Sequence, residues 1–232
     1  MENFLKKHQI IKKFCEGLDK GLSNSFLLVG ACGTGKSESI LTSLKELNLK
    51  ENEHFKYLNS YSSPLEFYHL LEEVNELEAP KLLVLDDSEE YITNKRILSL
   101  LRSSLWGNLE GKRVVHWNSP RAKVKSFEFT GKVIVLLNKI NLDNGLVRAL
   151  ISRGFFYNLA LSNKEIISLM RERIKKPYKN LNYKTKNKIV DFIAQKGLYS
   201  DKLNLRILIQ SYNLHLLSPN HWQELTSELL KV

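Results

Sequence analysis

The feature that most constrains the fold is a glycine-rich stretch that directly follows a short apolar run. The run SFLLVG ends at Gly30, and the stretch GACGTGKSESI occupies residues 30–40. It matches the pattern G-x-x-x-x-G-K-S, which predicts a strand, a tight loop and the start of a helix. Backbone N–H groups in such a loop bind phosphate oxygens, and the first turn of the helix adds its dipole. The sequence therefore predicts a nucleotide-binding loop made of Gly30, Ala31, Cys32, Gly33, Thr34, Gly35, Lys36 and Ser37.

The end of this loop and a later strand supply the groups that ATP chemistry needs. Lys36 is expected to bind the β and γ phosphates, and the Ser37 hydroxyl to ligate Mg²⁺. The run LLVLDD, residues 82–87, reads as a buried strand with Asp86 at its carboxyl end, where it would also hold the metal. Asp87 is our candidate for the carboxylate that orients and polarises the attacking water. The alternative is a site that binds ATP and switches without hydrolysis. The expected cofactors are ATP and Mg²⁺.

Apolar runs alternate with helical stretches as far as residue 162. Helices are expected over residues 1–20, 36–47, 64–77, 89–106 and 142–152, and strands over 25–30, 54–60, 81–87, 132–138 and 154–161. This alternation predicts an α/β domain, residues 1–162, with a five-stranded parallel sheet flanked by helices. Beyond it, helical patterns over 163–175, 184–196, 202–214 and 219–230 predict a small C-terminal α-helical domain, residues 163–232.

Composition and charge limit which cell compartments and which classes of partner the sequence favours. No apolar run approaches the roughly 18 residues of a membrane span, and the N-terminus lacks the apolar core of a signal peptide. Two cysteines make no disulfide framework, so we expect a reducing interior: the cytoplasm, or an intracellular host compartment if the source is viral. The net charge of +10 is concentrated in residues 111–132 and 163–232. Clustered basic charge favours a nucleic-acid partner; the alternative is a lysine-rich surface that serves solubility or reflects an AT-rich genome.

With these motifs in place, the chain resembles the AAA+ ATPases over almost its whole length. The resemblance implies that Asn138, at the end of VIVLLNKI, senses the γ-phosphate. It makes Arg153, in ALISRGFFYNL, the arginine that reaches a neighbouring subunit's ATP, with Arg148 as the alternative. Arg206, in DKLNLRILIQ, matches the arginine that contacts nucleotide from the helical lid. Asn59 is a weak match for a residue that restrains the catalytic carboxylate. The alternatives are a chance polar residue at a strand end for Asn138, a surface arginine for Arg153 or Arg148, and a solvated helix arginine for Arg206.

An arginine supplied by a neighbour implies self-association. The resemblance implies a ring, most often a hexamer; an unclosed spiral is also open, because a head-to-tail interface need not close.

Residues 112–130 read as a β-hairpin inserted before the strand that carries Asn138. Apolar residues fit two strands, and NSPR, residues 118–121, has the composition of a turn. One branch of the AAA+ proteins carries a hairpin at this point, where it projects into the central pore and grips the substrate. The strand residues are Val114, Val115 and Trp117 on one side and Val124, Phe127 and Phe129 on the other.

The hairpin tip favours nucleic acid, DNA first, as the substrate. Cations pair with phosphates and an aromatic ring stacks on bases. The candidate contacts are His116, Trp117, Arg121, Lys123 and Lys125. The alternative is a hairpin that builds the subunit interface. The basic stretch 171–188 is read as a solvated face of the lid in preference to a DNA site, which stays the alternative.

The expected function is an oligomeric, helicase-like ATPase that moves or remodels nucleic acid in DNA replication or mobile-element maintenance. The stretch LRSSLWGNLEGKRVV also resembles the run before the hairpin in superfamily 3 viral replicative helicases. Two alternatives stay open: a remodeller of polypeptides, and an ATP switch that loads a protein partner onto DNA.

Overall fold

The computed structural model describes residues 2–118 and 124–231, and it divides into two compact units. The sheet unit comprises Gln9–Gly30 and Lys36–Leu159, and the helical unit comprises Met1–His8, Ala31–Gly35 and Ala160–Val232. This division differs from the one drawn at residue 162, because two short segments from early in the chain join the helical unit. Lys7 accounts for one of them: its Nζ donates to the carbonyl of Ala160 at 2.7 Å and pairs with the Glu165 carboxylate.

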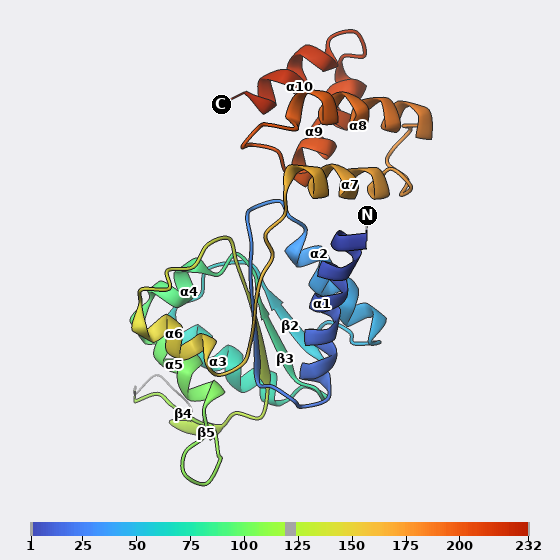
Figure 1. Cartoon of the computed structure of the whole chain (residues 1–232). Coiled ribbons are helices and arrows are strands. Elements are labelled where there is room, and N and C mark those ends of the chain that lie inside the picture. The colour runs from blue at the N-terminus through green and yellow to red at the C-terminus, as the bar shows by residue number, and fades with distance from the viewer. Residues whose placement is uncertain (1, 119–123, 232) are drawn as a thin grey trace. The chain divides into compact units, whose positions relative to one another are not determined.

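The sheet unit is built on five parallel strands, as the sequence predicts (Figure 1). Their order is β2–β3–β6–β1–β7, so the strands that precede Gly30 and Asp86 both lie beside β6. All residues of β1 and β3 are buried, and so are those of β6 after Lys132. Burial on both faces explains why these strands read as continuous apolar runs. The bounds are β1 Ser25–Val29, β2 Phe55–Leu58, β3 Leu82–Leu85, β6 Lys132–Leu137 and β7 Phe155–Asn158.

Helices cover both faces of this sheet. Figure 1 shows α2 and the part of α1 that belongs to this unit on one face, with α3, α5 and α6 on the other. Strand alternation assigns the side chains accordingly. Phe26 points toward α1, where its ring lies 4.9 Å from that of Phe14, whereas Leu27 joins the core beneath α3 and α5. The bounds are α1 Glu2–Asp19, α2 Lys36–Glu46, α3 Pro64–Asn75, α5 Lys95–Leu105 and α6 Gly145–Ile151.

The single helix expected over residues 89–106 is wrong, because the chain forms two helices there. They are α4, Glu89–Thr93, and α5, Lys95–Leu105. Asn94 separates them: its backbone is extended, and its side chain accepts from the N–H groups of Arg96 and Ile97. Asparagine is a strong N-cap residue, so it ends one helical stretch and starts another within a pattern that is otherwise continuous.

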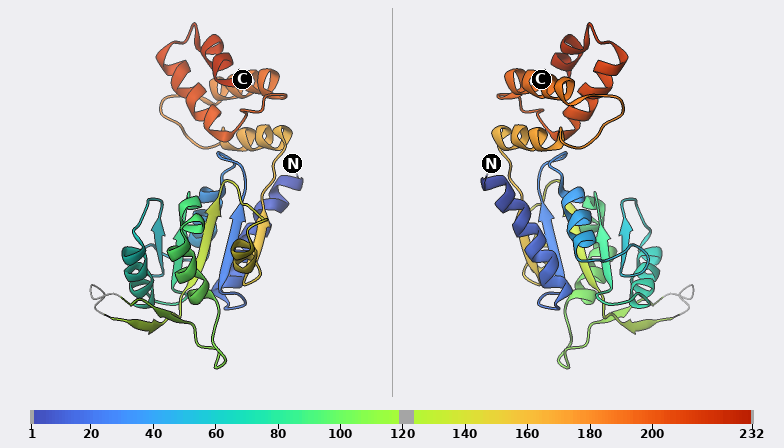
Figure 2. Two further views of the ribbon diagram at one scale, coloured as in Figure 1. Left: turned by 90° about the vertical axis from the view of Figure 1, so that its left-hand side faces the viewer. Right: turned by 90° about the vertical axis from the view of Figure 1, so that its right-hand side faces the viewer.

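The expected hairpin is present as β4, Val114–His116, paired antiparallel with β5, Ser126–Glu128. It leads directly into β6 and lies at the amino ends of the sheet strands, away from their carboxyl ends (Figure 2). The predicted turn falls mostly on residues 119–123, which lie outside the described residues.

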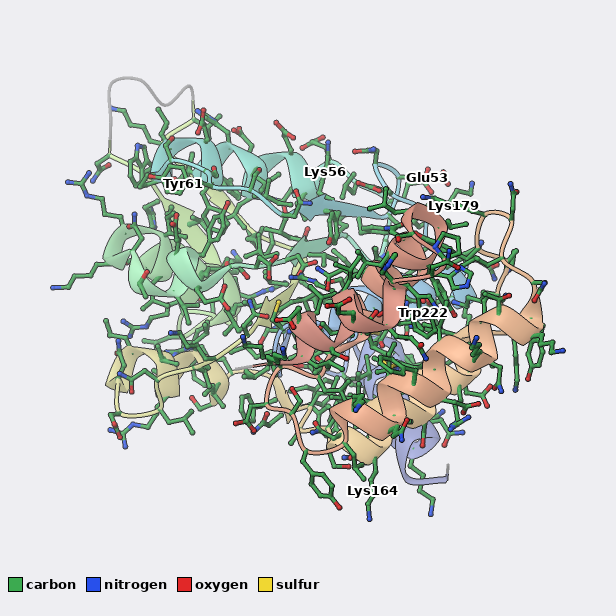
Figure 3. The ribbon with its side chains drawn as sticks, turned by 90° about the horizontal axis from the view of Figure 1, so that it is seen from above. Glu53, Lys56, Tyr61, Lys164, Lys179 and Trp222 are labelled. Atoms are coloured by element: carbon green, nitrogen blue, oxygen red, sulfur yellow. The ribbon has the colours of Figure 1, made fainter. Side chains whose placement is uncertain are left out.

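The helical unit carries four helices after residue 160: α7 Asn163–Arg173, α8 Tyr183–Gly197, α9 Leu205–Leu217 and α10 Trp222–Leu230. Their apolar faces share one core. The centre of the Trp222 ring, which Figure 3 labels, lies 5.1 Å from the centre of the Phe192 ring. Helix α7 begins with a capping box between Ser162 and Glu165. Among the described residues, no helix has both the length and the apolar character needed to cross a membrane.

Candidate nucleotide and magnesium site

The glycine-rich loop begins where β1 ends, at the carboxyl edge of the sheet. Gly30 donates its N–H to the carbonyl of Leu137, the last residue of β6, at 3.0 Å. A Cβ at Gly30 would lie 2.7 Å from the carbonyl oxygen of Leu159. A side chain therefore cannot be added at Gly30 without moving the backbone, and this contact accounts for the first glycine of the motif.

Lys36, the first residue of α2, has its ammonium group held inside the sheet unit. The Nζ donates to the carbonyl of Gly30 at 2.7 Å and to Oδ1 of Asn138 at 3.0 Å, and the residue is 6% exposed. Burying an ammonium is costly unless it is hydrogen-bonded, and these oxygens reduce that cost. The Lys36 ammonium group therefore lies at the carboxyl ends of the strands, where the sequence predicts that phosphate binds.

Asp86 and Asp87 follow β3 at the same edge of the sheet. The Asp86 N–H donates to the carbonyl of Leu58 at 2.8 Å, which continues the β2–β3 pairing by one residue and fixes the carboxylate at the strand end. Asp86 is 7% exposed, whereas Asp87 is exposed. Asp87 has φ of 46°, a left-handed backbone that aspartate tolerates better than most residues.

Asn138 brings the lysine and the second aspartate together. Its Nδ2 donates to Oδ1 of Asp87 at 3.1 Å, while its Oδ1 accepts from Lys36. The amide orientation follows from chemistry, because an ammonium only donates and a carboxylate only accepts. Glu89, which no sequence motif marks, accepts the Asn138 backbone N–H at 2.5 Å.

Tyr57, on β2, is a second residue of the site that no sequence motif marks. Its hydroxyl donates to Oδ2 of Asp86 and is also hydrogen-bonded to the side chain of Ser37. Burial, followed by the neighbouring Asp86, raises the pKa of the Tyr57 phenol. Ser37 and Asp86 offer hydroxyl and carboxylate oxygens, the hard ligands that Mg²⁺ prefers. The predicted metal pair therefore fits the ion.

In the helical unit, the loop segment Ala31–Gly35 lies against the start of α9. Leu205 donates its N–H to the carbonyl of Gly33 at 2.9 Å, and a Cβ on Gly33 would lie 2.8 Å from the Asn204 side chain. Gly33 and Gly35 have φ of 72° and 85°, which favours glycine at both positions. The exposed Arg206 is the second residue of α9, one position after Leu205.

Arg173, at the end of α7, approaches the same loop segment and was not predicted. Its Nη2 lies 3.8 Å from the position that a Cβ would take on Gly35. Burial lowers the pKa of its guanidinium, although arginine stays charged at any physiological pH. The only signal in the sequence is the run RERIKK, in which nothing distinguishes Arg173 from its basic neighbours.

Arg153, the arginine predicted to reach a neighbouring subunit's ATP, lies just after α6. Its hydrogen bond and its ring contact involve neither Lys36, Asn138 nor Asp87. Its Nη1 donates to the carbonyl of Ala149, and its guanidinium lies 5.2 Å from the centre of the Trp106 ring. Burial and the nearby Arg102 lower its pKa. Arg148, the alternative, is exposed on α6. Asn59 is exposed just beyond β2.

The hairpin presents some of its predicted contact residues to solvent. His116 and Lys125 are exposed. Trp117 is partly buried: its N–H donates to the Lys125 carbonyl at 2.9 Å, and its ring packs against that of Tyr68. Arg121 and Lys123 lie outside the described residues.

Comparisons with known proteins give the fold. No family model matches the chain. A curated relative, an uncharacterised 36.7 kDa protein from the nrdC–mobD intergenic region of enterobacteria phage T4, is 23% identical and covers 96% of this chain and 73% of its own length.

Among solved structures, the chain is similar to Thermotoga maritima RuvB. A lysine-to-arginine mutant of that protein matches with a TM-score of 0.60 and 15% identity over 99% of this chain and 69% of that one. RuvB, described as a Holliday junction branch migration motor, also matches with a TM-score of 0.56 and 16% identity over the same shares. A DNA replication initiation factor matches with a TM-score of 0.53 and 18% identity, over 96% of this chain and 65% of its own. The fold is that of the AAA+ P-loop ATPases. The resemblance to superfamily 3 viral helicases stays a prediction.

Proposed function

We propose that the chain is a magnesium-dependent ATP hydrolase that works as an oligomer on nucleic acid. The observation that carries the proposal is the hydrogen-bonded series from Lys36 through Asn138 to Asp87. It joins the cation expected to bind phosphate, the residue expected to sense it and the carboxylate expected to activate water.

The residues divide the work by their chemistry. The loop amides and Lys36 bind the phosphates, and Ser37 and Asp86 hold Mg²⁺, which shields the phosphate charge from the attacking water. Asp87 accepts a proton as that water forms its bond to the γ-phosphorus and the bond to the β–γ bridging oxygen breaks, yielding ADP and phosphate. The Asn138 amide, already bonded to Asp87, orients the water. Arg206 contacts nucleotide from the same subunit.

Arg153 is proposed to act on the ATP of a neighbouring subunit. Its guanidinium would stabilise the charge that develops on the transferring phosphoryl group. This role requires a ring or a spiral, for which a hexamer is the expected form. The Ala149 carbonyl and the Trp106 ring hold the guanidinium against its own subunit, so this role requires the side chain to leave these two partners when the neighbour arrives.

Nucleic acid is the proposed substrate because of charge and of the hairpin. The net charge is +10, and His116 and Lys125 are exposed on the β4–β5 ribbon. The structural neighbours described as a branch migration motor and as a replication initiation factor support the same class of substrate.

The test is the steady-state ATPase rate of the wild type, alone and with single-stranded DNA, duplex DNA or casein. The proposal expects a rate that rises with DNA and is lost in Lys36→Ala. Stimulation by casein alone would instead support a polypeptide remodeller.

A second candidate, a slow ATP switch that loads a protein onto DNA, is favoured by one observation. The candidate base, Asp87, has a short side chain, and one of its carboxylate oxygens already accepts a hydrogen bond from Asn138. Both features would reduce its ability to take a proton from water. The switch predicts tight ATP binding with a negligible rate under all these conditions, and a partner recovered by pull-down.

A further inference from the structure

Tyr57 stands between the two side chains that are expected to hold magnesium, Ser37 and Asp86. Its position follows from the sheet. Tyr57 is aligned with Val84 across the β2–β3 pair, and Asp86 lies two residues beyond Val84. Residues two apart share a face of a strand, so the phenol and the carboxylate project to the same side. Lys56, labelled in Figure 3, projects to the other side and pairs with Glu73 of α3.

The hydrogen bonds around Tyr57 have a fixed direction. An ionised carboxylate only accepts, so the Tyr57 hydroxyl must donate to Asp86. The Tyr57 oxygen then accepts from the hydroxyl of Ser37. The series therefore runs from Ser37 to Tyr57 to Asp86.

This direction is the one that a metal site needs. A serine that ligates a cation does so through an oxygen lone pair, and its hydrogen must then find another acceptor, which Tyr57 provides. Asp86 receives one donor on each oxygen, Tyr57 on Oδ2 and the Asp87 N–H on Oδ1 at 2.9 Å. Each carboxylate oxygen keeps a further lone pair for the metal or its water.

We propose that Tyr57 is a positioning residue for magnesium, which sets the orientation of Ser37 and Asp86 through its hydroxyl. The inference rests on the proposed function, because it assumes that these two residues hold the ion. Partners that orient metal ligands typically contribute roughly 10–100-fold to metal affinity or activity. Tyr57 touches neither water nor phosphate in this role and acts only through the two ligands.

The test compares Tyr57→Phe with Tyr91→Phe. Phenylalanine keeps the ring and removes the hydroxyl in both variants. Tyr91 is the matched control because it is a buried tyrosine of the same unit whose hydroxyl donates to the carbonyl of Ser60, at 2.5 Å. The measurements are the affinity for a fluorescent ATP analogue in EDTA, the same affinity across a Mg²⁺ titration, and Mn²⁺ binding to the nucleotide complex by electron paramagnetic resonance.

In EDTA, the affinity of Tyr57→Phe for the analogue is expected to lie within about twofold of the wild-type affinity. The variant should need about tenfold more Mg²⁺ to reach half of the Mg²⁺-dependent change in that affinity, and about tenfold more Mn²⁺ for half-maximal Mn²⁺ binding. Tyr91→Phe should match wild type in both. Equal Mg²⁺ requirements in the two variants would overturn the inference. Tighter metal binding by Tyr57→Phe would also overturn it, by showing that the hydroxyl competes with the ion.

The two proposals fail in different ways. A wild type that binds no nucleotide with Mg²⁺ overturns the proposed function and the role of Tyr57 with it. A wild type that binds magnesium and nucleotide without hydrolysis overturns only the hydrolase, and the metal titration of Tyr57→Phe remains decisive for the positioning role.

Discussion

Lys36 and Asp87 are joined by a single side chain, that of Asn138, which accepts from the lysine at 3.0 Å and donates to the aspartate at 3.1 Å. Only a side chain with both a donor and an acceptor can make this connection, and an amide does so without adding charge. In the proposed mechanism, a phosphate that accepts hydrogen bonds from Lys36 would weaken the bond between Lys36 and Asn138 and so alter the bond between Asn138 and Asp87. Asn138 would then couple phosphate binding to the activation of water.

Replacing Asn138 by alanine should separate binding from hydrolysis. We expect Asn138→Ala to bind ATP with nearly wild-type affinity and to lose roughly a hundredfold in kcat, because one preoriented donor is removed. The measurement pairs steady-state ATPase with nucleotide titration by fluorescence. Asn144→Ala is the control: it removes the N-cap of α6, costs about 1 kcal/mol of stability and should leave kcat unchanged. Equal losses in the two variants would mean that Asn138 acts through stability alone.

Mixing two inactive variants should test whether Arg153 acts on a neighbour. Arg153→Ala keeps its own phosphate site, whereas Lys36→Ala keeps its arginine, so a mixed oligomer contains complete sites at some interfaces. We expect each variant alone to lose about 10³-fold in kcat, and the mixture to recover part of the activity. Recovery should be absent when Arg153→Ala is mixed with a double variant lacking both residues. Arg148→Ala, on exposed α6, is the comparison that decides between the two candidate arginines.

His8 should make the helical unit sensitive to acid. Burial, with a contribution from the charge of Arg173, lowers the pKa of His8 from 6.5 to about 4. Between these two values the unfolded chain binds a proton that the folded chain does not, so this contribution to stability is complete above about pH 6.5 and is lost as the pH falls toward 4. In thermal melts, His8→Gln should therefore show a smaller fall in Tm than wild type between about pH 7 and about pH 4. Parallel curves for the two proteins would contradict the assignment.

The sequence predicts those parts of the site that follow from strand ends. Asp86 and Asn138 each follow an apolar run, and the carboxyl ends of parallel strands meet at one edge of the sheet, so their proximity to Lys36 needs no knowledge of register. The break at Asn94 is different, because the apolar period continues through it and only the local cap shows it.

Tyr57 and Arg173 could not be predicted, for physical reasons. Tyr57 lies inside a strand, and its meeting with Asp86 depends on β2 pairing with β3 in one register. That register is set by the packing of the whole sheet. Arg173 is one of many basic residues in its stretch, and its approach to Gly35 depends on how α7 packs within the helical unit.

Removing charges from the hairpin should weaken nucleic-acid binding and flatten its salt dependence together. Each cation that contacts a phosphate releases counterions, so each loss should reduce the slope of log K against log salt by about 0.9 on duplex DNA and about 0.7 on single strands. Lys125→Ala is the first variant, because Lys125 is exposed on the ribbon; Arg121→Ala combined with Lys123→Ala is the second. The measurement is fluorescence anisotropy of labelled DNA from low to physiological salt.

Lys45→Ala provides the control for the hairpin variants, since Lys45 is an exposed lysine on α2 and its removal changes net charge by the same amount as Lys125→Ala. It should leave the slope within error of wild type. Unchanged slopes in the hairpin variants would show that the hairpin does not contact the phosphates.

Sedimentation velocity with ATP tests the alternative, in which the hairpin builds the subunit interface. If the ribbon builds the subunit interface, the same substitutions will shift the oligomer toward the monomer while DNA binding per assembled particle stays constant.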